Sequence, residues 1–320
     1  MKKFVSKKKR EKVAKKAAKA AKKAKAEEEA VAAAALDREA RATSTTEHGS
    51  EFMDYGGWDV TRQTSFGLNL ARQSSFLKRR PFAHSACNLE QLRERLDTKG
   101  GQFAWALSFD PQFLAQLARH GFLPMAGQIF SNLICLLPKL HKERCILDFN
   151  NLHIPRSVRK KSRKFNLSVD QDIEGVIRGC QVQHGEGCWF YRPLTQSYRR
   201  LHREAIEGVR IHSIEIWKDG ALVGGELGYV AGGCYTSLSG FRTADGAGTI
   251  QCYALARLLE AQGFAFWDLG MPMDYKEGLG AKKIPRKVFL ARLQSASAQS
   301  PRLELSEPTD CRSVIDGKVK

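Results

Sequence analysis

The sequence predicts an α+β fold, and its second half carries that prediction. Residues 211–217 (IHSIEIW), 221–230 (ALVGGELGYV) and 234–241 (CYTSLSGF) are strand-like, and the short turns KDG and AGG separate them. Such tight turns join antiparallel neighbours. The glycine-rich stretch RTADGAG (242–248) then opens a helix over 249–262, and a further strand is expected over 264–270. Antiparallel strands followed by a helix and another strand indicate an α+β sheet.

Helices and a strand are also expected before this sheet. The segments 88–96 (NLEQLRERL) and 110–122 (DPQFLAQLARHGF) have the apolar spacing of amphipathic helices. In the second, Asp110 and Pro111 mark the start and Gly121 lies just past the end. Residues 146–149 predict a strand, and Pro155 begins a short helix.

The positive charge is concentrated at the N-terminus. The 320 residues carry a formal net charge of +18, and residues 1–26 alone hold thirteen Lys or Arg against Glu11. We interpret this Lys/Ala-rich stretch as a solvated, disordered tail. The functional alternative is attraction to nucleic acid phosphates or a nuclear-import address.

Composition excludes several other classes of protein. No apolar run approaches the roughly 20 residues that a membrane span needs, so we expect a soluble protein with no membrane partner. The eight cysteines include no C-x-x-C pair, which argues against a zinc site and a disulfide framework. They favour reduced thiols in the cytoplasm, with a nuclear or organellar location left open by the basic tail.

Two similar pentapeptides lie in the polar region before the first predicted helix. RQTSF (62–66) and RQSSF (72–76) each place an arginine three residues before a serine, Ser65 or Ser75. A kinase that recognises basic side chains would suit this pattern, which makes phosphorylation one hypothesis. Coincidence in a flexible linker is the other.

A basic cluster follows Pro155. Six of the nine residues from Arg156 to Lys164 are Lys or Arg. Because the cluster lies between two apolar segments, the fold would hold it in place, so contacts to phosphates stand as an alternative equal to a merely solvated face.

Asp268 ends an apolar segment and precedes a loop that contains Gly270, Pro272, Gly278 and Gly280. A carboxylate at the end of a strand is a common way to present a reactive group on rigid support. The alternative is a strand-terminal Asp that caps the following turn. If Asp268 handles a proton, Asp268→Asn should reduce turnover and leave folding intact.

Several ordered segments together resemble the leucyl/phenylalanyl-tRNA–protein transferases. They are LHIPRSVRKKSRKF (152–165), IHSIEIW (211–217), LVGGELG (222–228) and LGAKKIPRKVFL (279–290). The resemblance runs from about Ala115 to Leu293. It implies transfer of Leu, Phe or another amino acid from aminoacyl-tRNA to the N-terminal α-amine of a protein, which is thereby marked for degradation. It implies no cofactor beyond the charged tRNA and no metal, and we expect a monomer.

The resemblance also implies a fold and a division of the chain. The catalytic domain would be similar to the GCN5-related N-acetyltransferase fold, with a smaller α/β N-terminal domain before it. The expected regions are a basic tail and linker over 1–50, a Ser/Arg/Gln-rich linker over 51–87, the smaller domain over 88–165, the catalytic domain over 166–296 and a C-terminal tail over 297–320.

Residue chemistry and the resemblance together give a candidate site. Catalytic roles are predicted for Asp268, Tyr275 and His212. For His212, which sits in the middle of a strand, an ordinary core histidine is the alternative that its position favours. Substrate-binding roles are predicted for Trp189, Glu215, Glu226, Leu238, Ser239, Phe241, Gly270 and Gly280. Contacts to tRNA are predicted for Arg156, Arg159, Lys160, Lys161, Arg163, Lys164, Lys282 and Lys283.

The chain departs from the family pattern within this site. Gly270 stands where the family has a Gln beside its catalytic Asp, and Leu238 replaces an acid at the acyl pocket. Tyr275 and Gly278 replace a His and a Ser. Two other classes therefore stay open. One is an acyl-CoA-dependent N-acyltransferase, which RTADGAG would suit as a pyrophosphate loop, and the other is a non-catalytic tRNA-binding relative.

Overall fold

The computed structural model describes residues 58–130 and 133–318. Of these, residues 58–127 and 134–318 belong to one compact unit, and residues 128–130 and 133 are grouped separately. The basic tail and linker predicted over 1–50 lie outside the described residues.

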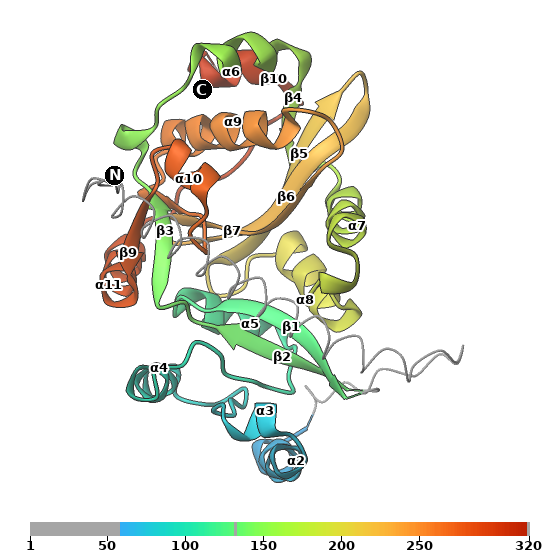
Figure 1. Cartoon of the computed structure of the whole chain (residues 1–320), viewed down its shortest axis with the longest axis vertical. Coiled ribbons are helices and arrows are strands. Elements are labelled where there is room, and N and C mark those ends of the chain that lie inside the picture. The colour runs from blue at the N-terminus through green and yellow to red at the C-terminus, as the bar shows by residue number, and fades with distance from the viewer. Residues whose placement is uncertain (1–57, 131–132, 319–320) are drawn as a thin grey trace, which may run out of the picture. The chain divides into compact units, whose positions relative to one another are not determined.

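An eight-stranded sheet organises the larger unit (Figure 1). Its strand order is β10 (Thr309–Asp310), β4 (Asn166–Val169), β5 (Val209–Lys218), β6 (Ala221–Ala231), β7 (Cys234–Arg242), β8 (Phe266–Asp268), β3 (Glu143–Leu147) and β9 (Lys282–Pro285). Neighbours are antiparallel except β7 and β8, which are parallel. A parallel pair needs a crossover, and α9 (Ala247–Ala261) supplies it. The predicted α+β class is confirmed.

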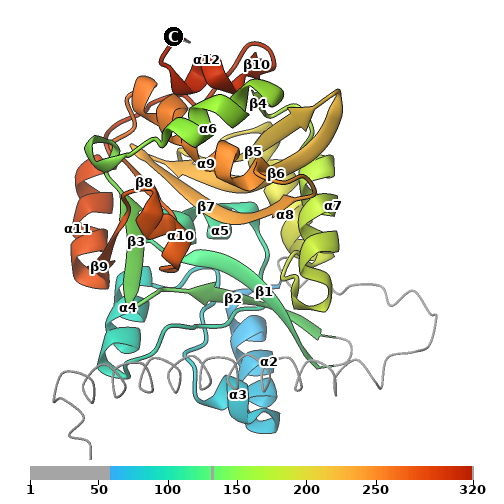
Figure 2. The ribbon, with the colours of Figure 1, turned by 45° about the horizontal axis from the view of Figure 1, so that its top comes forward.

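The two faces of the sheet bury separate apolar clusters. Because side chains alternate along a strand, Ile211 of β5 packs with the cluster that includes α7 (Ile173–His184) and α8 (Arg192–Arg203). Ile214 and Ile216 point the other way, into the cluster that includes α9. Figure 2 shows α6 (Arg156–Lys161) and α12 (Cys311–Ile315) together near β10 and β4.

The predicted helices before the sheet are present. Asn88 caps α4 (Leu89–Thr98), and the Asp110 carboxylate accepts a hydrogen bond from the Gln112 amide at the start of α5 (Pro111–Arg119). A two-stranded sheet, β1 (Leu123–Phe130) with β2 (Leu133–Lys139), follows. Further elements are η1 (Phe149–Asn151), η2 (Ser162–Lys164), η3 (Gly185–Gly187), α10 (Asp274–Gly278) and α11 (Arg286–Ala296).

Two segments that the sequence assigns to a linker and a tail contain regular structure. Helices α2 (Val60–Gln73) and α3 (Ser75–Lys78) lie within 51–87, where Leu70 and Leu77 are buried. Ser65 and Ser75 are exposed on these helices. In the C-terminal segment, β10 pairs with β4, and Val314 of α12 is buried. Polar composition hid these elements, because each buries only a few apolar side chains.

The predicted boundary between the two domains stays a prediction. Strand β3, from the segment assigned to the smaller domain, lies between β8 and β9 in the large sheet. Across residues 58–130 and 133–318, no helix has both the length and the apolarity to cross a membrane.

Candidate active site and basic pocket

A cavity of about 790 Å³ is lined by residues of β1, β6, β7, α9, α10 and the loop after β8. Its lining mixes aromatic and aliphatic side chains with many polar ones, which include the cations Lys139, Arg242 and Lys276. Concave sites that combine apolar walls with polar groups are typical of ligand pockets. The cavity brings together most of the predicted site. The predicted residues that line it are Trp189, Glu226, Leu238, Ser239, Phe241, Gly270 and Tyr275.

Glu226 supplies a buried carboxylate to this cavity, and its side chain is held by neutral donors. Its Oε1 accepts hydrogen bonds from the Tyr235 hydroxyl at 3.0 Å and the Ser237 hydroxyl at 2.8 Å. Its Oε2 accepts one from Nε2 of Gln251 of α9 at 2.9 Å. Burial raises the pKa of Glu226 to about 7, although the bonds from Ser237 and Tyr235 oppose that rise.

Lys276 is a cavity residue that the sequence reasoning missed. Its Nζ donates to the carbonyl oxygens of Leu269 at 2.5 Å and Met271 at 2.8 Å, and its side chain is buried. Burial lowers the pKa of Lys276. A lysine in a Gly/Pro-rich sequence usually predicts a solvated charge. The burial of Lys276 is therefore visible only in the folded structure. One N–H of the ammonium remains beyond the two carbonyl bonds.

Asp268 lies behind the cavity wall and does not line it. Its carboxylate is fully buried against Arg144, whose Nε lies 3.1 Å from Oδ1 and 3.2 Å from Oδ2. The Thr236 hydroxyl and the Gly270 amide also donate to it. The Gly270 amide is therefore occupied and is not available to a substrate. Asp268 reaches the cavity wall through its bond to the Gly270 amide but does not itself line the cavity, and its catalytic role remains a prediction.

His212 and Glu215 of β5 also lie away from the cavity lining. Nδ1 of His212 is 2.9 Å from the Asp170 carboxylate. The Glu215 carboxylate is fully buried and accepts hydrogen bonds from the hydroxyls of Ser168 and Ser213, each at 2.6 Å. Burial raises the pKa of Glu215. Both side chains join β5 to the β4–α7 segment, so the predicted roles at the substrate have no contact to support them.

Gly280 has a structural reason to be glycine. Its φ is +102°, and a Cβ at this position would lie 2.0 Å from the carbonyl oxygen of Asn151. Only glycine permits this backbone approach. Gly280 does not line the cavity.

Gly179 of α7 sets the position of Phe241 on the cavity wall. An added Cβ would lie 2.6 Å from three atoms of the Phe241 ring, so the ring would have to move. We expect Gly179→Ala to push Phe241 into the cavity, at a cost of about 1–3 kcal/mol in stability. Because the displaced ring would narrow the cavity, KM in this variant should rise more for the larger of two ligands than for the smaller. Gly187→Ala is a matched control, because its Cβ would meet no atom within 4 Å.

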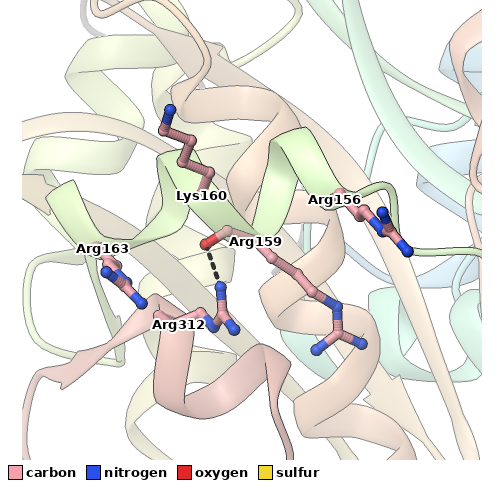
Figure 3. A pocket seen from close by; sticks show the side chains of 5 residues that line it. All are labelled: Arg156, Arg159, Lys160, Arg163 and Arg312. Atoms are coloured by element: carbon pink, nitrogen blue, oxygen red, sulfur yellow. Dashed lines mark hydrogen bonds between the residues drawn. The ribbon is translucent and has the colours of Figure 1, made fainter.

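A second, smaller pocket of about 260 Å³ is lined entirely by cations (Figure 3). Its residues are Arg156, Arg159, Lys160, Arg163 and Arg312. Arg312 comes from α12, and its Nη1 donates to the Arg159 carbonyl oxygen at 2.8 Å, the dashed line in Figure 3. Sequence reasoning missed Arg312, because nothing in its local sequence places it beside α6.

Part of this charge is neutralised. Asp316 forms ion pairs with Arg159 and Arg312. Within the described part of the chain, Arg156, Lys160 and Arg163 have no ion-pair partner, and all three are exposed. Five cations around one acid leave a strongly positive pocket suited to phosphate groups.

The other predicted tRNA contacts lie outside this pocket. Lys161 is 3.7 Å from Asp245, and Lys164 is exposed. Lys282 and Lys283 are on β9, at the opposite edge of the sheet from β10, and Lys283 is 3.2 Å from Glu143. Their predicted contacts would form a separate surface.

All eight cysteines are free thiols. Among the described residues, no group of three or more His, Cys, Asp and Glu side chains could hold a metal ion.

Comparison with known proteins identifies related sequences. The family described as leucyl/phenylalanyl-tRNA protein transferase matches residues 146–294. The chain is 32% identical to the transferase of that name from Azotobacter vinelandii over 204 residues, which covers 62% of this chain and 86% of the relative. For the transferase from Pseudomonas paraeruginosa, identity is 31%, over 66% of this chain and 91% of the relative.

Solved structures give weaker likenesses. FemX is 11% identical over 62% of this chain and 73% of that chain, with a TM-score of 0.38. A GCN5-related N-acetyltransferase from Kribbella flavida is 15% identical over 62% of this chain and 70% of that chain, with a TM-score of 0.31. At these scores, neither likeness bears on function.

Proposed function

The chain belongs to the leucyl/phenylalanyl-tRNA–protein transferase family, and from that premise we propose that it moves Leu or Phe from aminoacyl-tRNA to the N-terminal α-amine of an acceptor protein. The enzyme is an aminoacyltransferase. The added residue would mark the acceptor for degradation.

The cavity is the observation that carries the proposal. Trp189, Leu238 and Phe241 give it an apolar wall that suits the side chain of Leu or Phe. Tyr275, which is 58% exposed, also lines it and offers an aromatic face to the terminal adenine of the tRNA. A pocket that accepts both groups would hold the ester bond between them.

The chemistry asks little of the protein beyond positioning and proton transfer. An aminoacyl ester is already activated, so amide formation needs a neutral amine and a donor for the developing oxyanion. The Gly270 amide is bound to Asp268 and cannot supply that donor. We assign the oxyanion contact to the remaining N–H of Lys276, which lines the cavity.

The contacts of Asp268 support a positioning role. It holds the Gly270 amide at 2.9 Å and anchors Arg144 under the loop that follows β8. The same loop carries Leu269, Gly270 and Met271 along the cavity wall. Asp268 would thus fix the wall against which the donor lies.

The cationic pocket of α6 and α12 would bind tRNA phosphates. Arg156, Lys160 and Arg163 are exposed cations without partners among the described residues, as a phosphate site requires. Contacts to phosphate position a nucleic acid without reading its sequence, so this pocket would orient the tRNA while the cavity selects the amino acid.

A transfer assay tests the proposed function. The purified protein is mixed with tRNA charged with radioactive Leu or Phe and with a peptide that begins with Arg. We expect the label to appear on the peptide, and an N-acetylated copy of the peptide to accept none. Absence of label transfer from both charged tRNAs would contradict the proposal.

An acyl-CoA donor is the second candidate, and one observation favours it. Arg242, Gly248 and Thr249, from the glycine-rich stretch and the start of α9, line the same cavity. Free amides at a helix N-terminus attract a pyrophosphate. Turnover of acetyl-CoA with the same peptide, in the absence of tRNA, would support acyl-CoA as the donor.

A further inference from the structure

Among the described residues, Glu226 is the buried acid of the sheet that lines the cavity. A carboxylate has about four acceptor positions. Tyr235 and Ser237 fill both positions on Oε1, whereas Gln251 fills one on Oε2. One position on Oε2 is left, and Glu226 lines the cavity.

Glu226 also has no direct ion-pair partner. Within the described part of the chain, no Lys, Arg or His forms an ion pair with it, whereas Asp268 has Arg144. The charge of Lys276 acts on Glu226 without such contact and lowers its pKa, against the larger effect of burial. A buried carboxylate without a cation is costly unless it is protonated or a ligand brings the positive charge. Its location in a cavity makes a cationic ligand group the natural partner.

The strand register sets the position of this acid beside β7. The strand register pairs Glu226 of β6 with Gly240 of β7, two residues beyond Leu238, where the family pattern has its acid. A Cβ on Gly240 would lie 3.2 Å from Cβ of Glu226, so glycine there leaves the Glu226 side chain its space. The acid that lines this cavity therefore comes from β6.

We propose that Glu226 is the catalytic base, which takes a proton from the α-ammonium group of the acceptor before that nitrogen attacks the aminoacyl ester. The inference rests on the proposed function and deepens it. The sequence predicts that Glu226 binds substrate and that Asp268 is the base. In the structure, however, the Asp268 carboxylate forms an ion pair with Arg144.

The step balances in atoms and charge. The ionised Glu226 carboxylate takes one proton from R–NH3+, which leaves a neutral R–NH2. The nitrogen lone pair forms the new C–N bond at the ester carbonyl carbon, and the C–O bond to the tRNA ribose breaks. The second nitrogen proton goes to the departing ribose oxygen, which leaves as a hydroxyl. The proton on Glu226 is then released to water.

The titratable groups that face Glu226 come from four elements. They are Cys180 of α7, Tyr235 of β7, Cys252 of α9, and Tyr275 and Lys276 of α10. Burial raises the pKa of each cysteine to about 12, and it raises the pKa of Tyr235 above its ordinary value. The pKa of Glu226, about 7, lies where a base is most useful near neutral pH and just below the ordinary α-amine range.

The sign of the pH dependence follows from the direction of that shift. Below pH 7 Glu226 is protonated and cannot act as a base, so kcat/KM should rise with pH through about 7. In Glu226→Gln this limb should disappear and leave only the rise due to the acceptor amine itself. Lys276→Met, with Glu226 intact, should keep the limb, which separates the two groups.

The experiment compares wild type with Glu226→Gln on two acceptors. With an Arg-starting peptide near neutral pH, we expect a loss of about 100-fold in kcat/KM. With a peptide whose N-terminal nucleophile is an aminooxy group, which is neutral at that pH, most of the loss should disappear. Glu260→Gln, on the same helix as Gln251, is the control, since the partly exposed Glu260 pairs with Arg257 and does not line the cavity.

The possible outcomes test the transfer activity and the role of Glu226 separately. Absence of transfer by the wild type would contradict the proposed function. Transfer by the wild type with equal rates in a folded Glu226→Gln would overturn the role of Glu226. A third outcome is that Glu226→Gln loses the same factor in kcat/KM on both acceptors, and that this loss disappears when the amine of the donor amino acid is N-acetylated. That outcome would show that Glu226 binds the ammonium group of the donor instead. If Glu226→Gln fails to fold, Glu226→Asp on the two acceptors gives the same comparison, because it keeps the charge and withdraws it from the cavity.

Discussion

Asp268→Asn is expected to lower the free energy of unfolding by about 3–5 kcal/mol, because it leaves the Arg144 guanidinium buried without its counter-charge. Both side chains are fully buried. The guanidinium also lies 4.5 Å over the Phe289 ring, so it cannot reach water without disturbing the core. Urea unfolding of the purified variant measures the change.

The controls separate burial from charge. Asp316→Asn removes an acid that also pairs with arginines but sits near the surface, and should cost no more than about 1 kcal/mol. The double variant Arg144→Met with Asp268→Asn removes both charges and should recover much of the loss. An Asp268→Asn protein with wild-type stability and reduced turnover would restore the catalytic assignment that the sequence favours.

Charge reversal in the cationic pocket should produce the largest change in tRNA binding. When Arg156, Lys160 and Arg163 are all changed to Glu, the slope of log affinity against log salt should become shallower by about 2–3, since each lost phosphate contact contributes roughly 0.7–0.9. Affinity at low salt should fall with it. Fluorescence anisotropy with labelled tRNA over a salt series measures both.

A matched reversal elsewhere controls for net charge. Lys78, Arg95 and Lys99 are also exposed. Lys78 lies on α3, Arg95 on α4 and Lys99 directly after α4, and both helices are away from α6 (Figure 1). When these three residues are changed to Glu, the net charge falls by the same amount as in the pocket variant. The slope of log affinity against log salt should nevertheless stay close to that of the wild type. If the two triple variants behave alike, tRNA binding is diffuse and the pocket has no special role.

The hairpins and most of the cavity could be predicted from the sequence, because both depend on local pattern. Alternation and tight turns gave β5, β6 and β7, and short motifs placed Trp189 and Phe241 at the cavity. The Arg144–Asp268 ion pair could not be predicted, since the two residues are 124 positions apart. An arginine in a strand carries no signal of its partner.

Lys276 and Arg312 escaped prediction for a related reason. A charged residue in a loop or near a terminus is usually solvated, and only the packing of α10 and α12 reveals what each contacts. Conversely, Glu215 and His212 lie in a motif that suggests chemistry, yet their hydrogen bonds are internal to the β4–β5 region.

The central claim is that the cavity receives the aminoacyl end of the tRNA. A crystal structure with a non-hydrolysable phenylalanyl-adenosine analogue tests it most directly. The account predicts the phenyl ring against Trp189 and Phe241, the adenine near Tyr275, and the carbonyl carbon within reach of Glu226. An analogue bound elsewhere on the protein, with this cavity empty, would contradict it.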